Sequence, residues 1–146
     1  MRLPWWAVVL MMAGASPASL AVETGLRRLL FPPDFELLRA YLRPALGAPA
    51  WGLCVATLLL GLPAWWVQTR LYARLVAARG AAYADRARVL SLYAASTLPQ
   101  LAALVAALAF TFGAPLTPVA VSVTAAALWV SLLGARAPSP AAGPRD

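Results

Sequence analysis

Residues 90–112 form an uncharged apolar stretch, and this stretch constrains the fold more than any other part of the chain. A helix of that length rises about 35 Å, which is enough to cross a hydrocarbon core of roughly 30 Å. Pro99 and Gln100 lie near its middle. The stretch is therefore predicted to be a membrane-spanning helix that carries one polar amide at bilayer depth.

The rest of the chain is apolar enough to supply further spans. Of its 146 residues, 62% are hydrophobic, and the mean hydropathy is +0.75. Soluble domains are nearer about half apolar. We expect one membrane domain over residues 1–134, with spans at about 3–22, 50–67, 90–112 and 116–134.

The first apolar run admits two interpretations. Arg2 precedes it, and the small residues near Pro17 resemble the cleavage region of a signal peptide. The run nevertheless continues to Val22, which is long enough to span. A retained helix is favoured on that ground, and a cleaved signal peptide is the alternative.

Residues 34–43 are too charged for a span and are predicted to form a short helix in the membrane interface. Two prolines precede Asp34, which is suited to the N-cap position, and Pro44 is expected to end the helix. Apolar and charged side chains fall on different sides. The apolar positions are Phe35, Leu38 and Leu42, and the charged ones are Glu36, Arg39 and Arg43.

Small and weakly polar residues recur at helical spacing in the later spans, as expected for helices that pack closely. In the second span the stripe consists of Cys54, Thr57, Gly61, Ala64 and Gln68. In the fourth span it consists of Thr117, Ala120, Thr124, Ala127, Ser131 and Gly134. In the third span it consists of Tyr93, Ser96, Thr97, Gln100, Ala103, Ala107 and Thr111, with Leu98, Leu101, Val105, Leu108 and Phe112 on the lipid side.

The link at residues 113–115 is so short that the third and fourth spans must form a hairpin. Counting inward from this link places Gln100 between the depths of Thr124 and Ser131, where we predict a hydrogen bond. The expected fold is thus an all-α membrane four-helix bundle of two helical hairpins. The interfacial helix lies between the first two spans, and residues 135–146 form a disordered tail.

All 12 basic residues are arginine, against 5 acidic residues, and the net charge is +7. They lie between apolar runs, which favours a membrane surface over nucleic acid as their partner. The central loop is the most basic segment, with Arg70, Arg74, Arg79, Arg86 and Arg88. These side chains are candidates for binding acidic lipid headgroups, although loop arginines also serve simply to fix orientation.

In a four-span arrangement, Arg2, the central loop and the tail lie on the same side of the membrane. That side carries eight arginines, and the opposite side carries four. This bias predicts that both termini lie in the cytoplasm. There is no histidine, and the single cysteine, Cys54, lies in an apolar run. No metal site, cofactor or catalytic group is expected, so enzymatic activity is not predicted.

Ser96, Thr97, Pro99 and Gln100 occupy a stretch that resembles the third helix of small uncharacterised bacterial integral membrane proteins with four helices. In these proteins the third helix follows a basic loop and carries a polar or acidic residue near a proline. Some such hairpins look like the ion-carrying ring subunit of rotary ATP synthases. Here the stretch has no carboxylate, which argues against an ion-carrying role. The resemblance implies that the chain is located in the bacterial inner membrane.

We therefore expect a noncatalytic integral membrane protein that is a structural or accessory subunit of a membrane assembly. Its expected partners are membrane lipids with acidic headgroups and either other copies of itself or other membrane subunits. The alternative is a small oligomeric transporter or channel with a polar stripe around Gln100. The two hypotheses differ in whether that stripe is buried in packing or accessible to water.

Overall fold

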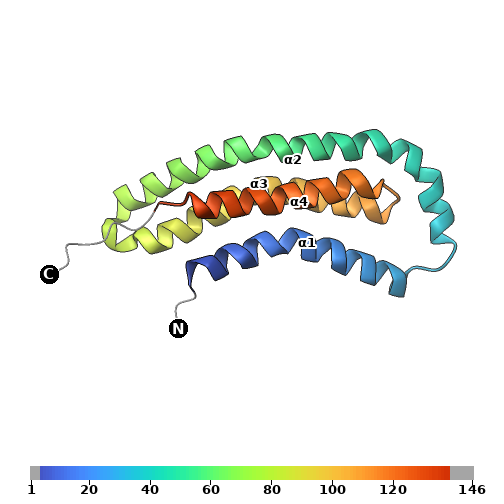
Figure 1. Ribbon diagram of the computed structural model, residues 1–146, viewed down its shortest axis with the longest axis horizontal. Coiled ribbons are helices and arrows are strands. Elements are labelled where there is room, and N and C mark those ends of the chain that lie inside the picture. Colours follow the sequence, from blue (N-terminus) through green and yellow to red (C-terminus); the bar gives the residue numbers. More distant parts are fainter. Residues whose placement is uncertain (1–3, 139–146) are drawn as a thin grey trace.

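The computed structural model describes residues 4–138, and within that range the regular structure is entirely helical (Figure 1). The elements are α1 (Trp5–Leu30), α2 (Phe35–Arg79), a one-turn 3-10 helix η1 (Ala81–Tyr83), α3 (Ala84–Thr111) and α4 (Leu116–Ala135). The four α-helices are each long and apolar enough to cross a membrane. The predicted tail falls mostly on residues 139–146, which lie outside the described residues.

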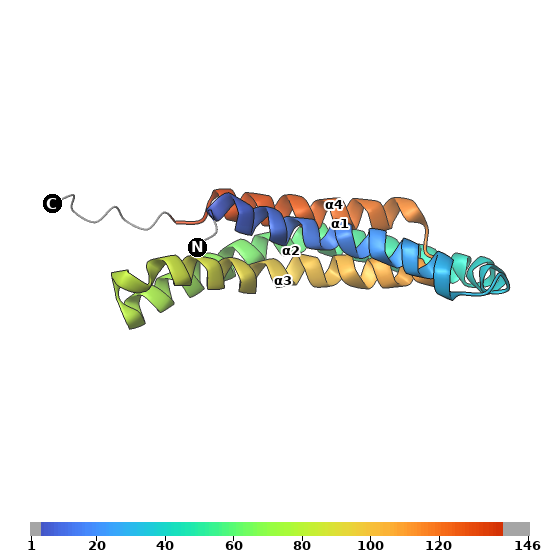
Figure 2. The ribbon, with the colours of Figure 1, turned by 90° about the horizontal axis from the view of Figure 1, so that it is seen from below.

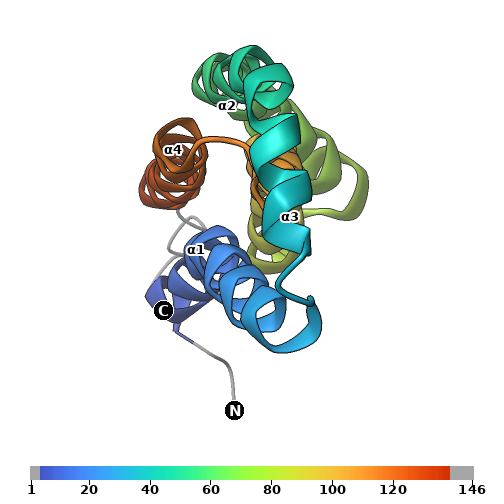
Figure 3. The ribbon, with the colours of Figure 1, turned by 90° about the vertical axis from the view of Figure 1, so that its right-hand side faces the viewer.

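The helices alternate in direction, and α3 and α4 lie between α1 and α2 (Figure 3). Helix α2 packs against α3 and α4 from one side, and α1 packs against the same pair from the other. In the described residues α1 and α2 do not pack on each other, so the first two spans do not form the close hairpin that we expected. The α3–α4 hairpin is formed at residues 112–115, as predicted.

Helix α2 is continuous for 45 residues, or about 68 Å at 1.5 Å per residue. The predicted helix end at Pro44 is wrong, because α2 continues through Pro44, Pro49 and Pro63. Prolines inside a helix bend it without ending it where neighbouring packing holds the chain. Figure 1 shows the first turns of α2 bent around the end of the α3–α4 hairpin. Asp34 takes the predicted N-cap position, without a side-chain capping bond.

The opposite end of α2 projects beyond the bundle. Figure 2 shows the turn between α2 and α3 extending past the start of α1 and the end of α4. Helix α2 ends at Arg79 and is followed by Gly80, whose φ of 79° suits glycine. Helix α3 begins at Ala84, before the start of the predicted span at residue 90. The arginines of the predicted central loop therefore lie on helical turns at this projecting end.

The interior is built from small residues. Ala64, Ala95, Ala103 and Ala126 are fully buried, and they let the helix backbones approach closely. The predicted second-span stripe is confirmed, because all five of its members are buried: Cys54, Thr57, Gly61, Ala64 and Gln68. At Gly61 the Trp129 side chain of α4 occupies the space that a Cβ would need, so these helices meet through a glycine.

The predicted packing stripe of α4 is wrong at its hydroxyl residues, although its last member, Gly134, is buried. Thr117, Thr124 and Ser131 are exposed, and the buried face is instead formed by residues such as Val119, Ser122, Val123, Ala126 and Val130. The hydroxyl of Ser131 donates to the carbonyl oxygen of Ala127 within its own helix, at 2.9 Å. A hydroxyl that is bonded in this way needs no partner on another helix, so it gives little information about which face is inward.

The predicted stripe of α3 is confirmed in part. Ser96, Ala103 and Ala107 are buried, whereas Tyr93 and Thr97 are exposed. Four members of the predicted lipid side are exposed, namely Leu101, Val105, Leu108 and Phe112. Leu98 is only partly exposed and packs against the core residues around Leu92.

Candidate functional site

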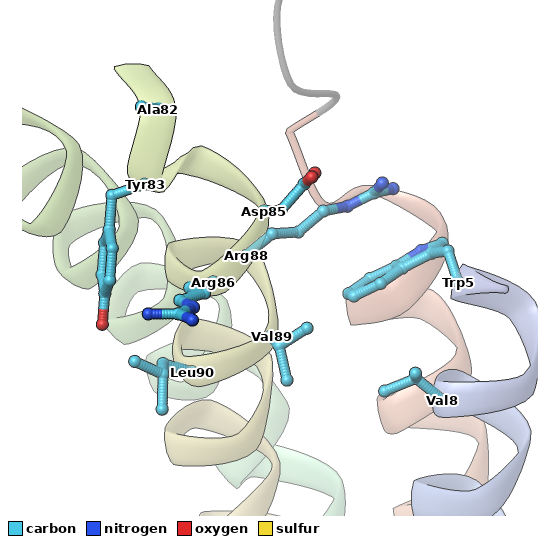
Figure 4. A pocket seen from close by; sticks show the side chains of 9 residues that line it. All are labelled: Trp5, Val8, Ala82, Tyr83, Asp85, Arg86, Arg88, Val89 and Leu90. Carbon is cyan, nitrogen blue, oxygen red and sulfur yellow. The ribbon is translucent and has the colours of Figure 1, made fainter. Parts of the chain in front are cut away.

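A cavity of about 890 Å³ opens at the end of the bundle where α1 and α3 begin (Figure 4). We call it the basic cavity. Helix α3 and η1 form one wall, and the first turns of α1 form the other. Its lining residues are Trp5, Val8, Ala82, Tyr83, Asp85, Arg86, Arg88, Val89 and Leu90.

Trp5 holds the α1 side of the basic cavity in place. Its indole Nε1 donates a hydrogen bond of 3.0 Å to the carbonyl oxygen of Gly134, at the end of α4. The Arg88 guanidinium carbon lies over the Trp5 ring, 3.9 Å from the ring centroid. One side chain thus contacts α3 and α4 together, and the cation–π contact fixes the position of Arg88.

Gly134 makes this arrangement possible. A Cβ at this position would meet the side chain of Val9, so only glycine lets α1 approach α4 so closely. The small residue was predicted to lie in a packing stripe, and it is buried. Its partner on α1 could not be identified from the sequence, because α1 was expected to pair with the second span.

The Arg88 side chain has a donor that is not used within the described residues. Its Nε atom is buried and has no hydrogen-bond partner there. Figure 4 shows the Asp85 carboxylate near the Arg88 stem, with the guanidinium extended toward Trp5. Arg86 points away from Trp5, toward Tyr83 and Leu90. Two guanidinium groups therefore flank the opening, on either side of α3.

The other predicted lipid-binding arginines lie outside this cavity. The guanidinium carbon of Arg70 lies 5.4 Å from the centroid of Trp66, and that of Arg79 lies 4.8 Å from the centroid of Tyr83. Arg74 is exposed. Of the five predicted lipid-binding arginines, only Arg86 and Arg88 line the basic cavity. Trp5 also lines it, and the sequence analysis did not identify this residue as a neighbour of the arginines.

Gln100 does not bond to Thr124 or Ser131 as predicted. Its Nε2 donates instead to the carbonyl oxygen of Met12 on α1, at 2.6 Å. The next carbonyl along α1, that of Ala13, has no helical donor because Pro17 has no N–H. The predicted hairpin partner was wrong because the acceptor is a backbone atom on a helix that was not expected to lie beside α3.

The predicted polar stripe is only partly assembled. Gln100 and Thr97 line a groove of about 280 Å³ between α1 and α3, together with Ser16 and Ser19. Ser96 and Thr97 donate within their own helix, to the carbonyl oxygens of Tyr93 and Ala94. Thr124 and Ser131 are exposed on α4 and are not among the residues that line the groove.

A second charged group lies at the opposite end of the bundle. Arg39 donates from Nε to the carbonyl oxygen of Thr111 and from Nη2 to that of Phe110, both at 3.1 Å. Its Nη1 also pairs with Glu36 at 2.8 Å, and Arg27 joins the same carboxylate at 2.9 Å. Arg39 therefore caps the last turn of α3, where cations are favourable.

Within the described residues, no group of three or more His, Cys, Asp or Glu side chains is placed to hold a metal ion. Comparisons with protein-family models, with curated proteins and with solved structures found no match. The functional argument therefore depends on the geometry of the chain itself.

Proposed function

We propose that this chain is a noncatalytic integral membrane protein that acts as a structural or accessory subunit of a membrane assembly. One observation carries the proposal: two side-chain amides and two indoles of the four helices each donate a hydrogen bond to another helix. Gln68 donates to the carbonyl oxygen of Leu133 at 3.1 Å, and Trp129 donates to that of Leu58 at 3.1 Å. Gln100 and Trp5 make the corresponding bonds to Met12 and Gly134.

These four bonds link α1 to α3, α1 to α4, and α2 to α4. In hydrocarbon a polar donor must be satisfied within the protein, and such bonds add to the packing of small residues. Gln68 shows this best, since its side chain is only 1% exposed and its amide reaches a backbone carbonyl. The pattern favours a rigid bundle whose outer surface, rather than its interior, meets other molecules.

The outer face of α1 is the best candidate for meeting a protein partner. Trp6, Leu10 and Met11 are all more than half exposed. Apart from the ion pair of Arg27 with Glu36 near its far end, α1 packs only against α3 and α4 within the described residues. An assembly subunit would cover such a face with another membrane helix, either from a second copy or from a different chain.

We further propose the bacterial inner membrane as the location, with both termini in the cytoplasm. The support is the distribution of arginine, because eight of the 12 lie on one side of a four-span arrangement. The contacts of Trp5 with Gly134 and Arg88 keep the start of α1, the end of α4 and the start of α3 at one end of the bundle.

Site-specific photo-crosslinking in native membranes tests the assembly proposal. A photoreactive residue replaces Met11 on the outer face of α1, and a matched control replaces Leu108 on the outer face of α3, which is similarly exposed. A discrete crosslinked protein from Met11, of the size of a second copy or of one other chain, supports the proposal. Lipid adducts alone from both positions contradict it.

The alternative is a small oligomeric transporter or channel. It is favoured by the groove between α1 and α3, because Ser16, Thr97 and Gln100 place polar atoms on the outside of one chain. Several copies arranged around a central axis could enclose such grooves. This function requires water to reach the Gln100 stripe, whereas a packing role does not.

A further inference from the structure

Both walls of the basic cavity become apolar toward the middle of the bundle, the α3 wall from charged residues and the α1 wall from a tryptophan. On α3, Leu90 lies one helical turn beyond Arg86, and on α1, Val8 lies about one turn beyond Trp5. Both steps lead from the end of the bundle toward its middle. Figure 4 shows Val8, Val89 and Leu90 on the inner side of the arginines. A ligand that fits both walls has an anionic end and an apolar body.

The charge of the lining favours an anion. Two arginines and one aspartate line the cavity, which leaves an excess of one positive charge. The planar guanidinium group binds phosphate oxygens with two parallel hydrogen bonds, and stacking on the Trp5 ring holds Arg88 in one orientation. A preoriented side chain loses less conformational freedom when it binds.

We propose that the basic cavity is a binding site for an anionic phospholipid. Arg88, held against the Trp5 ring, binds the phosphate, and the upper parts of the acyl chains lie against Val8 and Val89. Arg86, on the other side of α3, adds positive charge at the opening. The volume of about 890 Å³ is at the upper end of the range for small-molecule sites, which suits a headgroup and the glycerol region. Trp5 lies at the level where aromatic side chains prefer the headgroup region.

This inference rests on the membrane placement in the proposed function and does not depend on a protein partner. It also differs from general attraction between basic loops and acidic lipids, which every arginine at this end would share. Arg70 and Arg74 provide the comparison, since they lie on α2 near the same end and do not line the cavity. If the cavity is a specific site, replacing Arg86 and Arg88 weakens lipid binding more than replacing Arg70 and Arg74.

The test is a lipid titration of the delipidated full chain in detergent, followed by native mass spectrometry. The ligands are phosphatidylglycerol and phosphatidylcholine with identical acyl chains. We expect phosphatidylglycerol to bind more tightly than phosphatidylcholine. The double variant R86Q and R88Q should lower the affinity for phosphatidylglycerol about tenfold or more, since each basic side chain contributes appreciably near an anionic surface. The matched variant R70Q and R74Q removes the same charge and should change it less than about twofold.

A second variant separates binding from folding. Val89→Trp fills the apolar floor and keeps every charge, and Val89 is already partly exposed, so the helix tolerates the change. We expect it to lower lipid affinity while the thermal unfolding midpoint stays near that of the parent chain. Inorganic phosphate is titrated alone to test whether a soluble anion is sufficient.

Three results overturn the proposal. They are equal binding of the two lipids, equal losses in the two double-arginine variants, and binding of inorganic phosphate as tight as that of phosphatidylglycerol. Photo-crosslinking from Met11 is measured on the same variants. Equal binding of the two lipids together with a discrete crosslink from Met11 rejects the lipid site alone. Selective binding of phosphatidylglycerol together with only lipid adducts from Met11 rejects the assembly role alone.

Discussion

Trp5 and Gly134 join the first and last helices of the described chain, with a hydrogen bond of 3.0 Å from the indole Nε1 to the glycine carbonyl oxygen. The contact closes the bundle between residues that are 129 positions apart in sequence. The absence of a side chain at Gly134 brings Val9 close to the α4 backbone. The position of α1 therefore depends on one glycine as well as on one tryptophan.

Gly134→Val should destabilise the bundle. The added side chain meets Val9, whose branched side chain has little freedom to move, so we expect a loss of about 1–3 kcal/mol in the free energy of unfolding. Reversible unfolding in mixed detergent measures the change. Gly14→Val, in open space on α1, is the control. Similar losses in both variants would show that helix propensity, rather than the Val9 contact, causes the effect.

Gly61→Ala should also cost about 1–3 kcal/mol, because the new Cβ collides with the Trp129 ring. Trp129 cannot easily move away while its Nε1 donates to Leu58. In a double-mutant cycle with Trp129→Leu, the cost of Gly61→Ala should largely disappear, since the ring that it meets is gone. Additive effects in the cycle would contradict the contact between α2 and α4.

Gln100→Leu should lower the free energy of unfolding by about 0.6–1.7 kcal/mol, the range for hydrogen bonds between membrane helices. The loss reflects the bond to the Met12 carbonyl oxygen on α1. Thr97→Val is the matched control, because its hydroxyl bonds within α3 and joins no other helix. The same unfolding assay in detergent measures both variants, and an equal loss in the control would remove the evidence for a bond between helices.

Arg39→Gln should destabilise the contact between the start of α2 and the end of α3 by about 1.5–3 kcal/mol. The variant removes charged hydrogen bonds to the last carbonyl groups of α3. Arg43→Gln, which removes the same charge at an exposed position on α2, should change stability little. Hydrogen exchange at Thr111 and Phe112 measures local opening. Unchanged protection in Arg39→Gln would contradict the capping role.

The sequence predicted which segments are helical better than it predicted which face of each helix is buried. The α2 stripe was correct because Gly61 and Gln68 lie among large apolar residues, so the contrast around the helix is strong. Helix α4 consists mostly of Ala, Val, Leu, Ser and Thr, which suit lipid and protein interiors almost equally. Its spacing therefore carried little information, and the predicted face was wrong.

The contacts between helices were the least predictable part. Gln100, Gln68, Trp5 and Trp129 all donate to backbone carbonyl oxygens, and every residue has such an acceptor. Side-chain patterns cannot select among these acceptors without the helix arrangement. The basic cavity was missed for the same reason. Arg88 was identified from charge, but its contact with Trp5 depends on α1 lying beside α3.

The central claim is that the polar side chains inside the spans hold helices together and do not line a path for solute. Cysteine substitution at Thr97, Gln100 and Leu104 in a Cys54→Ser background tests it in native membrane vesicles, with a membrane-impermeant thiol reagent applied to both faces. Ala81→Cys, at an exposed site near the projecting turn, is the positive control. We predict labelling at position 81 and none at 97, 100 and 104. Labelling at these three positions at a rate similar to the control would contradict the claim and support a channel.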